Sequence, residues 1–310
     1  MEGDDLLPPD LPPVEVPLLP EEQRVLDAIR DVNDDFDIRY EYDGTLRAGP
    51  ICSDDETLQV ATLARLTRMT FHTGMQSARG LAGLAGHPRL RLLEFSFVEL
   101  VDPPPDGSLS SIPNLRTLHF SDCTLPAGPL CDIGRSRSLR ELYFYDCNAT
   151  DESCLPFRDL GGLEALELDW TKVSDVGDIL AGLSSLKRLS LAETLVDDRV
   201  TPVIGTLIGL TELIVGGTRI TQSSVPVFAS LPKLEMLTLS GIPLDRESLI
   251  ALSTISTLRT LFVDEWPMPP EVRAELVRFR QLTSLYVEWD GVPKAEKAKL
   301  RRAMPGCDIP

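Results

Sequence analysis

The sequence predicts an α/β solenoid, in which short parallel strands line one side of a curved stack and helices line the other. Three observations support this prediction. One unit recurs about every 24 residues, each copy opens with alternating apolar residues, and each copy continues with apolar residues at helical spacing. Because every unit packs only on its neighbours, a chain of 310 residues can form one continuous core.

The repeat is clearest between Leu163 and Val196, where LEALELDWTKVSD is followed by LKRLSLAETLVDD. Both stretches read L-x-x-L-x-L-x-x-T-x-V. In a strand, alternate residues face opposite sides, so we expect these leucines to face the core and the residues between them to face outward. The same leucine opens ten units, at Leu66, Leu90, Leu115, Leu139, Leu163, Leu186, Leu210, Leu234, Leu258 and Leu282.

The second half of each unit carries apolar residues three apart, as at Leu180 and Leu183, which is typical of a helix. A strand, a helix and a parallel strand join with right-handed connectivity. Narrow strands and wider helices then bend the stack into an arc. We expect the helical halves to be capped by Ser174, Asp198, Ser223 and Asp245.

The copies from Leu163 onward resemble bacterial leucine-rich repeats of the consensus L-x-x-L-x-L-x-x-T-x-V-[ST]-D. The resemblance covers about residues 66–292. It implies a right-handed horseshoe with a parallel sheet on the concave face and helices on the convex face, used for protein–protein contact. Pro103 to Pro105 depart from the pattern, and we expect no regular helix beside them.

The sequence outside the repeats predicts three further regions. Residues 1–20 are rich in proline and acids and are expected to form a disordered tail. Residues 21–65 are expected to form an N-terminal cap of helix, strand (36–44) and helix, the second helix capped by Ser53 or Asp54. Residues 66–292 form the ten repeats, and residues 293–310 are expected to form a C-terminal cap.

The net charge of -18 makes nucleic acid an unexpected partner, because phosphate backbones are repelled. Residues 1–60 hold 17 acids and 4 bases, so the acidity is mostly N-terminal. No apolar run reaches the ~18 residues that span a bilayer, and no secretory signal is visible. The six cysteines include no C-x-x-C pair, and we interpret Cys123 and Cys147 as buried thiols in a reducing cytoplasm.

The sequence contains no motif that predicts catalysis, and only three histidines are available as general bases. His72, Glu94 and His119 fall on outward positions of three neighbouring strands, which makes a weak metal site conceivable. His72 is offset by two residues from the other two, and no second carboxylate completes the set. We therefore expect neither an enzyme, nor a cofactor, nor a metal.

Aromatic residues and acids gather on the concave face. The central row is expected to read Thr70, Glu94, His119, Tyr143, Glu167, Ser190, Ile214, Thr238, Phe262 and Tyr286. Such residues match the composition of binding hot spots. We predict one patch of partner-binding residues at Glu94, His119, Tyr143, Tyr145, Glu167, Asp169 and Trp170. We predict a second patch at Phe262, Asp264, Tyr286, Glu288 and Trp289.

Two alternatives to this interpretation stay open. Strand propensity alone favours aromatic residues, and the acids could be neutralised by a flanking basic row. That row is expected at Arg91, Arg116, Arg140, Lys187 and Arg259. The first functional hypothesis is a non-enzymatic module that binds a protein or peptide with basic residues. The second is an adaptor subunit of an enzyme complex, docked through residues 1–35.

Overall fold

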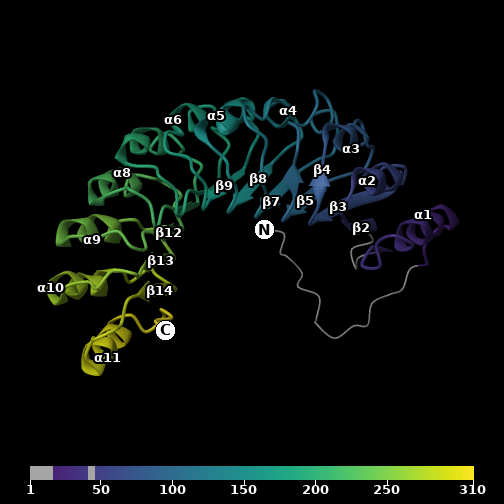
Figure 1. Ribbon diagram of the computed structural model, residues 1–310. Helices are drawn as coiled ribbons and strands as arrows, with labels where there is room; N and C mark the ends of the chain where they lie inside the picture. Colours follow the sequence, from purple (N-terminus) through teal and green to yellow (C-terminus); the bar gives the residue numbers. More distant parts are fainter. Residues whose placement is uncertain (1–16, 41–45) are drawn as a thin grey trace.

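The computed structural model, which describes residues 17–40 and 46–310, is an arc with strands on its concave side and helices on its convex side (Figure 1). Its main sheet has the order β1-β2-β3-β5-β7-β8-β9-β10-β11-β12-β13-β14. Among the strand pairs of the described residues, β1 and β2 are antiparallel and the others are parallel. The predicted horseshoe is therefore confirmed. Most of the predicted tail, residues 1–16, lies outside the described residues.

The strands are short because each repeat contributes one rung. They are β1 (Asp37–Tyr40), β2 (Leu46–Ile51), β3 (Leu66–His72), β5 (Leu92–Ser96), β7 (Thr117–Ser121), β8 (Glu141–Tyr145), β9 (Ala165–Asp169), β10 (Arg188–Ser190), β11 (Glu212–Ile214), β12 (Met236–Thr238), β13 (Thr260–Val263) and β14 (Ser284–Val287). A separate two-stranded sheet pairs β4 (Met75–Gln76) with β6 (Glu99–Leu100).

The convex side is built from short helices. The α-helices are α1 (Pro20–Arg30), α2 (Asp54–Val60), α3 (Ala78–Ala82), α4 (Cys131–Gly134), α5 (Asp151–Cys154), α6 (Gly177–Leu180), α7 (Thr201–Ile204), α8 (Val225–Phe228), α9 (Arg246–Ser253), α10 (Pro270–Arg273) and α11 (Lys294–Ala303). The 3-10 helices are η1 (Leu155–Asp159), η2 (Asp198–Val200), η3 (Gln222–Ser224) and η4 (Ala274–Arg278).

The chain that follows Pro103 to Pro105 forms no helix before β7, as expected. The buried Asp132 carboxylate holds this loop instead. It accepts hydrogen bonds from the backbone nitrogens of Gly107 and Leu109, each at 2.7 Å, and from the Ser108 hydroxyl at 3.0 Å. Fixed acceptors of this kind satisfy the donors that a helix would otherwise pair.

The core behind strands β3 to β8 contains a stack of phenylalanine rings. Phe71 and Phe95 lie 4.3 Å apart between centroids, and Phe120 lies 4.8 Å from both Phe95 and Phe144. Each of these four side chains is at most 1% exposed. Parallel in-register strands bring identical side chains into a column, so one residue type per repeat produces this stack.

Aspartates that follow a helix cap join neighbouring repeats. Asp151 accepts from the backbone nitrogen and hydroxyl of Ser174, both at 2.7 Å. Asp198 accepts in the same way from Thr221, at 2.9 and 2.7 Å. Asp54 makes the equivalent bonds to Ser77. The [ST]-D part of the repeat is thus explained, because the first residue caps its own helix and the second reaches the next repeat.

This arrangement corrects three of the four expected caps. Asp197 caps in place of Asp198, and Thr221 caps in place of Ser223, because Asp198 is already engaged by the next repeat. Ser174 donates to Asp151 and caps no helix. Asp245 is a cap as predicted, accepting from the backbone nitrogen of Ser248 at 2.7 Å.

A residue with a left-handed backbone turns the chain within three residues of the end of each central strand. Its φ angle is 57° at Thr73, 54° at Asp122 and 56° at Glu193, and 66° at Gly217 in the same position. Its backbone nitrogen still donates across to the next repeat, as from Asp122 to the Tyr145 carbonyl at 2.9 Å. The full set is Thr73, Phe97, Asp122, Asp146, Trp170, Glu193, Gly217, Gly241 and Glu265.

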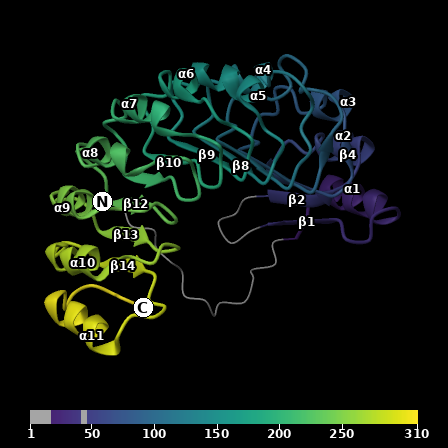
Figure 2. The ribbon, with the colours of Figure 1, turned by 60° about the vertical axis from the view of Figure 1, so that its left-hand side comes forward.

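Both ends of the core are covered. At the N-terminal end, α1 packs with Leu26 and Ile29 buried, beside the antiparallel pair of β1 and β2 (Figure 2). The strand β2, which sequence analysis did not expect, pairs with β1 on one side and with β3 on the other. At the other end, α11 is followed by a segment whose Asp308 bridges Ser284 of β14 and whose Ile309 is buried. No helix of the described residues is long and apolar enough to cross a membrane.

Candidate functional site

The strand register places the predicted central row on one face. Glu94 pairs with His119, His119 with Tyr143, and Tyr143 with Glu167. The pairing continues through Ser190, Ile214, Thr238, Phe262 and Tyr286. The adjoining row runs from His72 through Ser96, Ser121 and Tyr145 to Asp169. The register read from the leucines is therefore confirmed.

The middle of the first patch is a histidine beside a tyrosine. The rings of His119 and Tyr143 meet edge to face, with centroids 5.8 Å apart. Burial and the carboxylates of Glu141 and Glu167 raise the pKa of Tyr143 to about 12, so its hydroxyl stays protonated at neutral pH. The pair places two nearly perpendicular aromatic rings with polar atoms side by side on the concave face.

Two acids of the central row are already paired with arginines. Glu94 accepts from Arg68 at 2.7 Å, and Glu167 lies 2.6 Å from Arg188. Arg188 also reaches Glu212 at 3.0 Å. These pairs cross between strands and neutralise the acids locally.

The prediction that the flanking basic row neutralises these acids is therefore wrong. Arg68 and Arg188 lie two residues before the central row and share its face, whereas the expected bases lie three residues before it and point away. Arg140 donates to the Leu139 carbonyl at 2.7 Å and Arg259 to the Ser256 carbonyl at 2.9 Å. Lys187 pairs with Glu164 at 2.6 Å.

Asp169 is the acid of this patch that has no ion pair among the described residues. Its Oδ1 accepts from the Ser190 hydroxyl at 2.6 Å and from the Ala192 backbone nitrogen at 3.0 Å. Burial raises the pKa of Asp169 to about 6, although these two hydrogen bonds act in the opposite direction. A partially desolvated carboxylate is a strong acceptor for a cation from a partner.

Two aromatic side chains beside Asp169 are open to solvent. Tyr145 is 48% exposed and Trp170 is 52% exposed. Phe97, which sequence analysis did not include, is 55% exposed, and its ring meets His72 edge to face at 5.6 Å. Phe97, Trp170 and the acids Asp122 and Asp146 occupy the left-handed position of successive repeats. The glycines at this position in two later repeats, Gly217 and Gly241, could have indicated from the sequence that the backbone is left-handed there.

The second patch lies apart from the first, on β13 and β14. Phe262 and Tyr286 stack with centroids 4.2 Å apart and planes 4° apart. Asp264 accepts from Ser240, and Glu288 accepts from the Asp290 backbone nitrogen at 3.0 Å. Strands β10 to β12 separate the two patches, so the structure does not join them.

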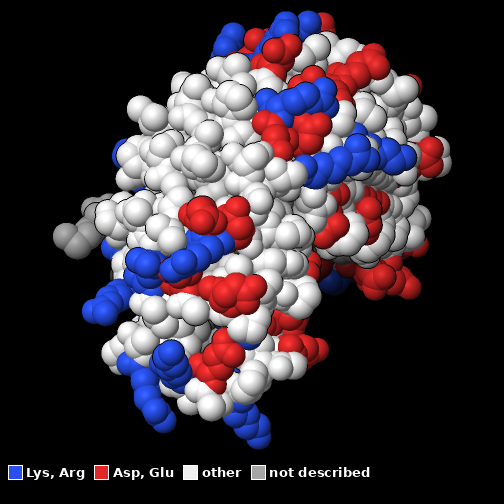
Figure 3. All heavy atoms as spheres, turned by 90° about the vertical axis from the view of Figure 1, so that its left-hand side faces the viewer, with Lys and Arg blue, Asp and Glu red and all other residues white. Residues whose placement is uncertain are grey.

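Trp289 differs from the other predicted site residues because a lysine of α11 lies over its ring. It packs against the core, and the Lys297 ammonium lies over its ring at 4.9 Å. Figure 3 shows acids and bases interspersed on the side formed by the C-terminal repeats. That side presents no continuous basic stripe for a phosphate backbone.

His72, Glu94 and His119 line a hollow of about 430 Å³ at the N-terminal end of the sheet, together with residues of β1 and β2. Asp37 and Thr70 also line it. Within the described residues, no three His, Cys, Asp or Glu side chains are grouped to hold a metal ion. Glu94 is held by Arg68 instead.

The comparisons with known proteins concern the fold. No protein-family model and no curated protein matches the chain. An internalin, InlF of Listeria monocytogenes, is 15% identical, with a TM-score of 0.61 over 93% of this chain and 94% of that one. A chain of the octameric complex of Latrophilin 3, Unc5D and FLRT2 (LRR) is 17% identical, with a TM-score of 0.56 over 80% and 84%. TLR13 in complex with ssRNA13 is 17% identical, with a TM-score of 0.51 over 76% and 41%.

Proposed function

Because the chain has a leucine-rich-repeat fold, we propose that it is a non-enzymatic module that holds a protein or peptide against concave strands β5 to β9. The observation that carries this proposal is the row of His119 and Tyr143 beside Asp169, with Tyr145 and Trp170 half exposed at its edge. The core requires none of these side chains, since it is closed by the leucines and phenylalanines behind them. Exposed aromatic rings around a desolvated carboxylate have the composition of a binding hot spot.

The chemistry of the surface favours a partner with basic and apolar groups. Glu94 and Glu167 already form ion pairs with arginines, so they add little net negative charge to the surface. Asp169 retains a carboxylate with no ion pair within the described residues. A lysine or arginine of the partner would pair with Asp169 while its apolar neighbours cover Tyr145 and Trp170.

The solved structures support a macromolecular partner. FLRT2 is part of a complex with Latrophilin 3 and Unc5D, and TLR13 is in complex with ssRNA. For this chain, a net charge of -18 disfavours RNA, so we propose a protein partner and no nucleic acid. The free thiols of Cys123 and Cys147, which donate to backbone carbonyls at 3.4 Å, suit the reducing cytoplasm that we propose as the compartment.

The test is affinity capture from an extract of the native cell with a double variant, His119→Ala with Tyr143→Ala. We expect partners held by the unmodified chain to be lost, because both rings lie on the proposed surface. Thr238→Ala, on the same sheet face between the patches, is the matched control and should retain them. Unchanged capture by the double variant, with circular dichroism showing it folded, would reject the site.

The second proposal is an adaptor that docks through its N-terminal segment. The buried Leu26 and Ile29 of α1 make that helix part of the N-terminal cap, which restricts a free docking segment to the residues before it. The stacked Phe262 and Tyr286 provide a second contact surface for either function. Deleting residues 1–16 separates the two hypotheses, because only the adaptor loses a distinct set of partners.

A further inference from the structure

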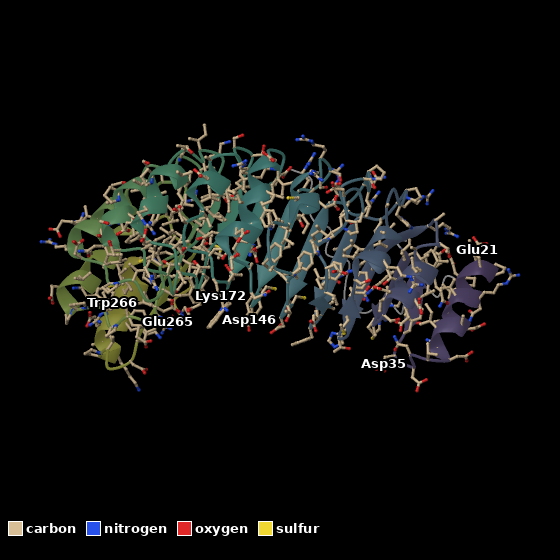
Figure 4. The ribbon with its side chains drawn as sticks, turned by 45° about the horizontal axis from the view of Figure 1, so that its top comes forward. Glu21, Asp35, Asp146, Lys172, Glu265 and Trp266 are labelled. Atoms are coloured by element: carbon tan, nitrogen blue, oxygen red, sulfur yellow. The ribbon has the colours of Figure 1, made fainter. Side chains whose placement is uncertain are left out.

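Four left-handed turn residues form a strip along the edge where the strands end. The strip consists of Phe97, Asp122, Asp146 and Trp170, one from each of four successive repeats. Its ends are aromatic and its middle is acidic. Figure 4 shows Asp146 at this edge of the molecule, with Lys172 nearby and Glu265 farther along.

The two aromatic residues of the strip are unusual for their backbone. Aspartate tolerates a left-handed conformation, but a bulky aromatic residue there is an outlier. The same position holds glycine at Gly217 and Gly241, so the fold accepts a residue without a side chain. Phe97 and Trp170 nevertheless keep more than half of their surfaces in solvent. Strain at an exposed aromatic side chain points to a role in contact rather than in packing.

The backbone of the strip is held rigidly. The nitrogen of Phe97 donates to the Ser121 carbonyl at 3.0 Å, and that of Trp170 donates to the Ala192 carbonyl at 2.9 Å. Asp146 donates to the Asp169 carbonyl at 3.1 Å. The backbone from which the four side chains project is therefore fixed, so no backbone ordering is required when a partner binds.

The two carboxylates in the middle of the strip form no ion pair with any described residue. The Asp122 carboxylate accepts one hydrogen bond, from Ser121 at 2.8 Å. The Asp146 carboxylate is exposed and has no hydrogen bond or ion pair with any described residue. Two carboxylates on neighbouring rungs repel each other, and a cation between them would remove that repulsion.

The spacing of the strip matches an extended peptide. Neighbouring parallel strands lie about 4.8 Å apart, so three steps place Phe97 and Trp170 about 14 Å apart. An extended chain advances about 3.4 Å per residue, which makes this distance about four residues. Residues n, n+2 and n+4 of an extended peptide share one face. Residue n+2 would then lie between Asp122 and Asp146.

We propose that this strip binds an extended segment of a partner protein with apolar residues at n and n+4 and lysine or arginine at n+2. The peptide crosses the strands along the length of the arc. Phe97 and Trp170 cover the two apolar side chains, and the two aspartates share the central cation. This inference rests on the proposed protein-binding function and adds the chemistry of the partner.

The test is selection of a displayed library of random twelve-residue peptides on the immobilised full chain. We expect the enriched sequences to carry a central Lys or Arg with an apolar residue two positions away on each side. The enriched peptide should bind at least tenfold more weakly to Phe97→Gly with Trp170→Gly, measured by fluorescence anisotropy. It should also bind at least tenfold more weakly to Asp122→Asn with Asp146→Asn, which keeps the shape and the left-handed tolerance.

Glu265→Gly is the matched control, since it occupies the same turn position outside the strip and should bind with unchanged affinity. Circular dichroism confirms that each variant is folded. No enrichment, a different consensus, or binding that survives both double variants overturns the proposal. A peptide that is lost only in His119→Ala with Tyr143→Ala rejects the strip and retains the concave site. Partner capture that is insensitive to the concave variants rejects the proposed function separately.

Discussion

Replacing Asp169 by asparagine should stabilise the protein at high pH. The Oδ1 of Asp169 accepts both of its hydrogen bonds, from Ser190 and from the Ala192 nitrogen, and the amide oxygen of asparagine can accept the same two. The substitution therefore removes a desolvated charge without removing either bond. Leaving a polar group in place while deleting its charge isolates the electrostatic effect.

The magnitude and the sign follow from the raised pKa. Burial raises the pKa of Asp169 from 3.8 to about 6, and each unit corresponds to about 1.4 kcal/mol. The shift of roughly two units gives a value of about 3 kcal/mol at most, and solvent at this half-buried group reduces it to about 2 kcal/mol. Between pH 4 and pH 6 the folded chain binds a proton that the unfolded chain does not. The unmodified protein loses stability as pH rises through this window.

Urea unfolding at pH 4 and pH 8 measures this difference. We expect Asp169→Asn to be about 2 kcal/mol more stable than the unmodified chain at pH 8 and equal to it within about 0.5 kcal/mol at pH 4. The control Asp146→Asn, at an exposed carboxylate, should change stability by less than about 0.5 kcal/mol at both values. An Asp169→Asn chain that is less stable at pH 8 would refute the reasoning. Loss of partner binding in the stabilised variant would show why the costly carboxylate is kept.

Three further predictions concern the stack and its ends. Phe120→Ala removes a ring that stacks on both neighbours and should cost about 4 kcal/mol in urea unfolding, against about 3 kcal/mol for Phe228→Ala, which is equally buried. Equal costs would mean that the stacking adds nothing. Asp198→Ala removes the acceptor of Thr221 and should cost about 2 kcal/mol at pH 7. Partial burial raises the pKa of Asp198, but hydrogen bonds from Ser224 and Thr221 outweigh it and lower that pKa. The destabilisation by Asp198→Ala should therefore become smaller below about pH 4, where the carboxylate is protonated. An equally large destabilisation below about pH 4 would contradict this prediction. Deletion of residues 1–16 should leave both the melting temperature and partner capture unchanged, and loss of a distinct partner set would favour the adaptor hypothesis.

The leucine spacing was sufficient to predict the register, and with it the concave row. The leucines mark the same strand position in every unit, even where the interval is 23 or 25 residues, so the pairing of Tyr143 with Glu167 followed directly. Because alternate residues of a strand face opposite sides, the spacing also determines which arginines lie on the concave face. The expected basic row failed because Arg116 and Arg140 lie an odd number of residues from the row, and Arg68 and Arg188 were available at the even distance.

Features that depend on contacts between repeats were harder to predict. Asp198 is a good cap by residue type, but its carboxylate is taken by Thr221 of the next repeat, and so Asp197 caps instead. Trp289 follows a strand as Trp170 does, yet Lys297 of α11 covers it. Neither outcome can be read from a single repeat, because each depends on a residue from another part of the chain.

The strand β2 was missed for a local reason. Its sequence LRAGPI contains glycine and proline, which are depleted in strands, and it lacks a long run of β-branched residues. Pairing with β1 on one side and β3 on the other stabilises it as a strand. Tertiary pairing therefore overrides the weak local preference.

Hydroxyl-radical footprinting of the chain with and without its captured partner tests the central claim most directly. We expect oxidation of Tyr145 and Trp170 to fall at least threefold in the complex. Val32 and Ile208 lie outside the proposed surface and are 79% and 66% exposed, so each should be oxidised to the same extent in both states. Unchanged oxidation of Tyr145 and Trp170, with protection of the convex helices instead, would contradict binding on the concave face.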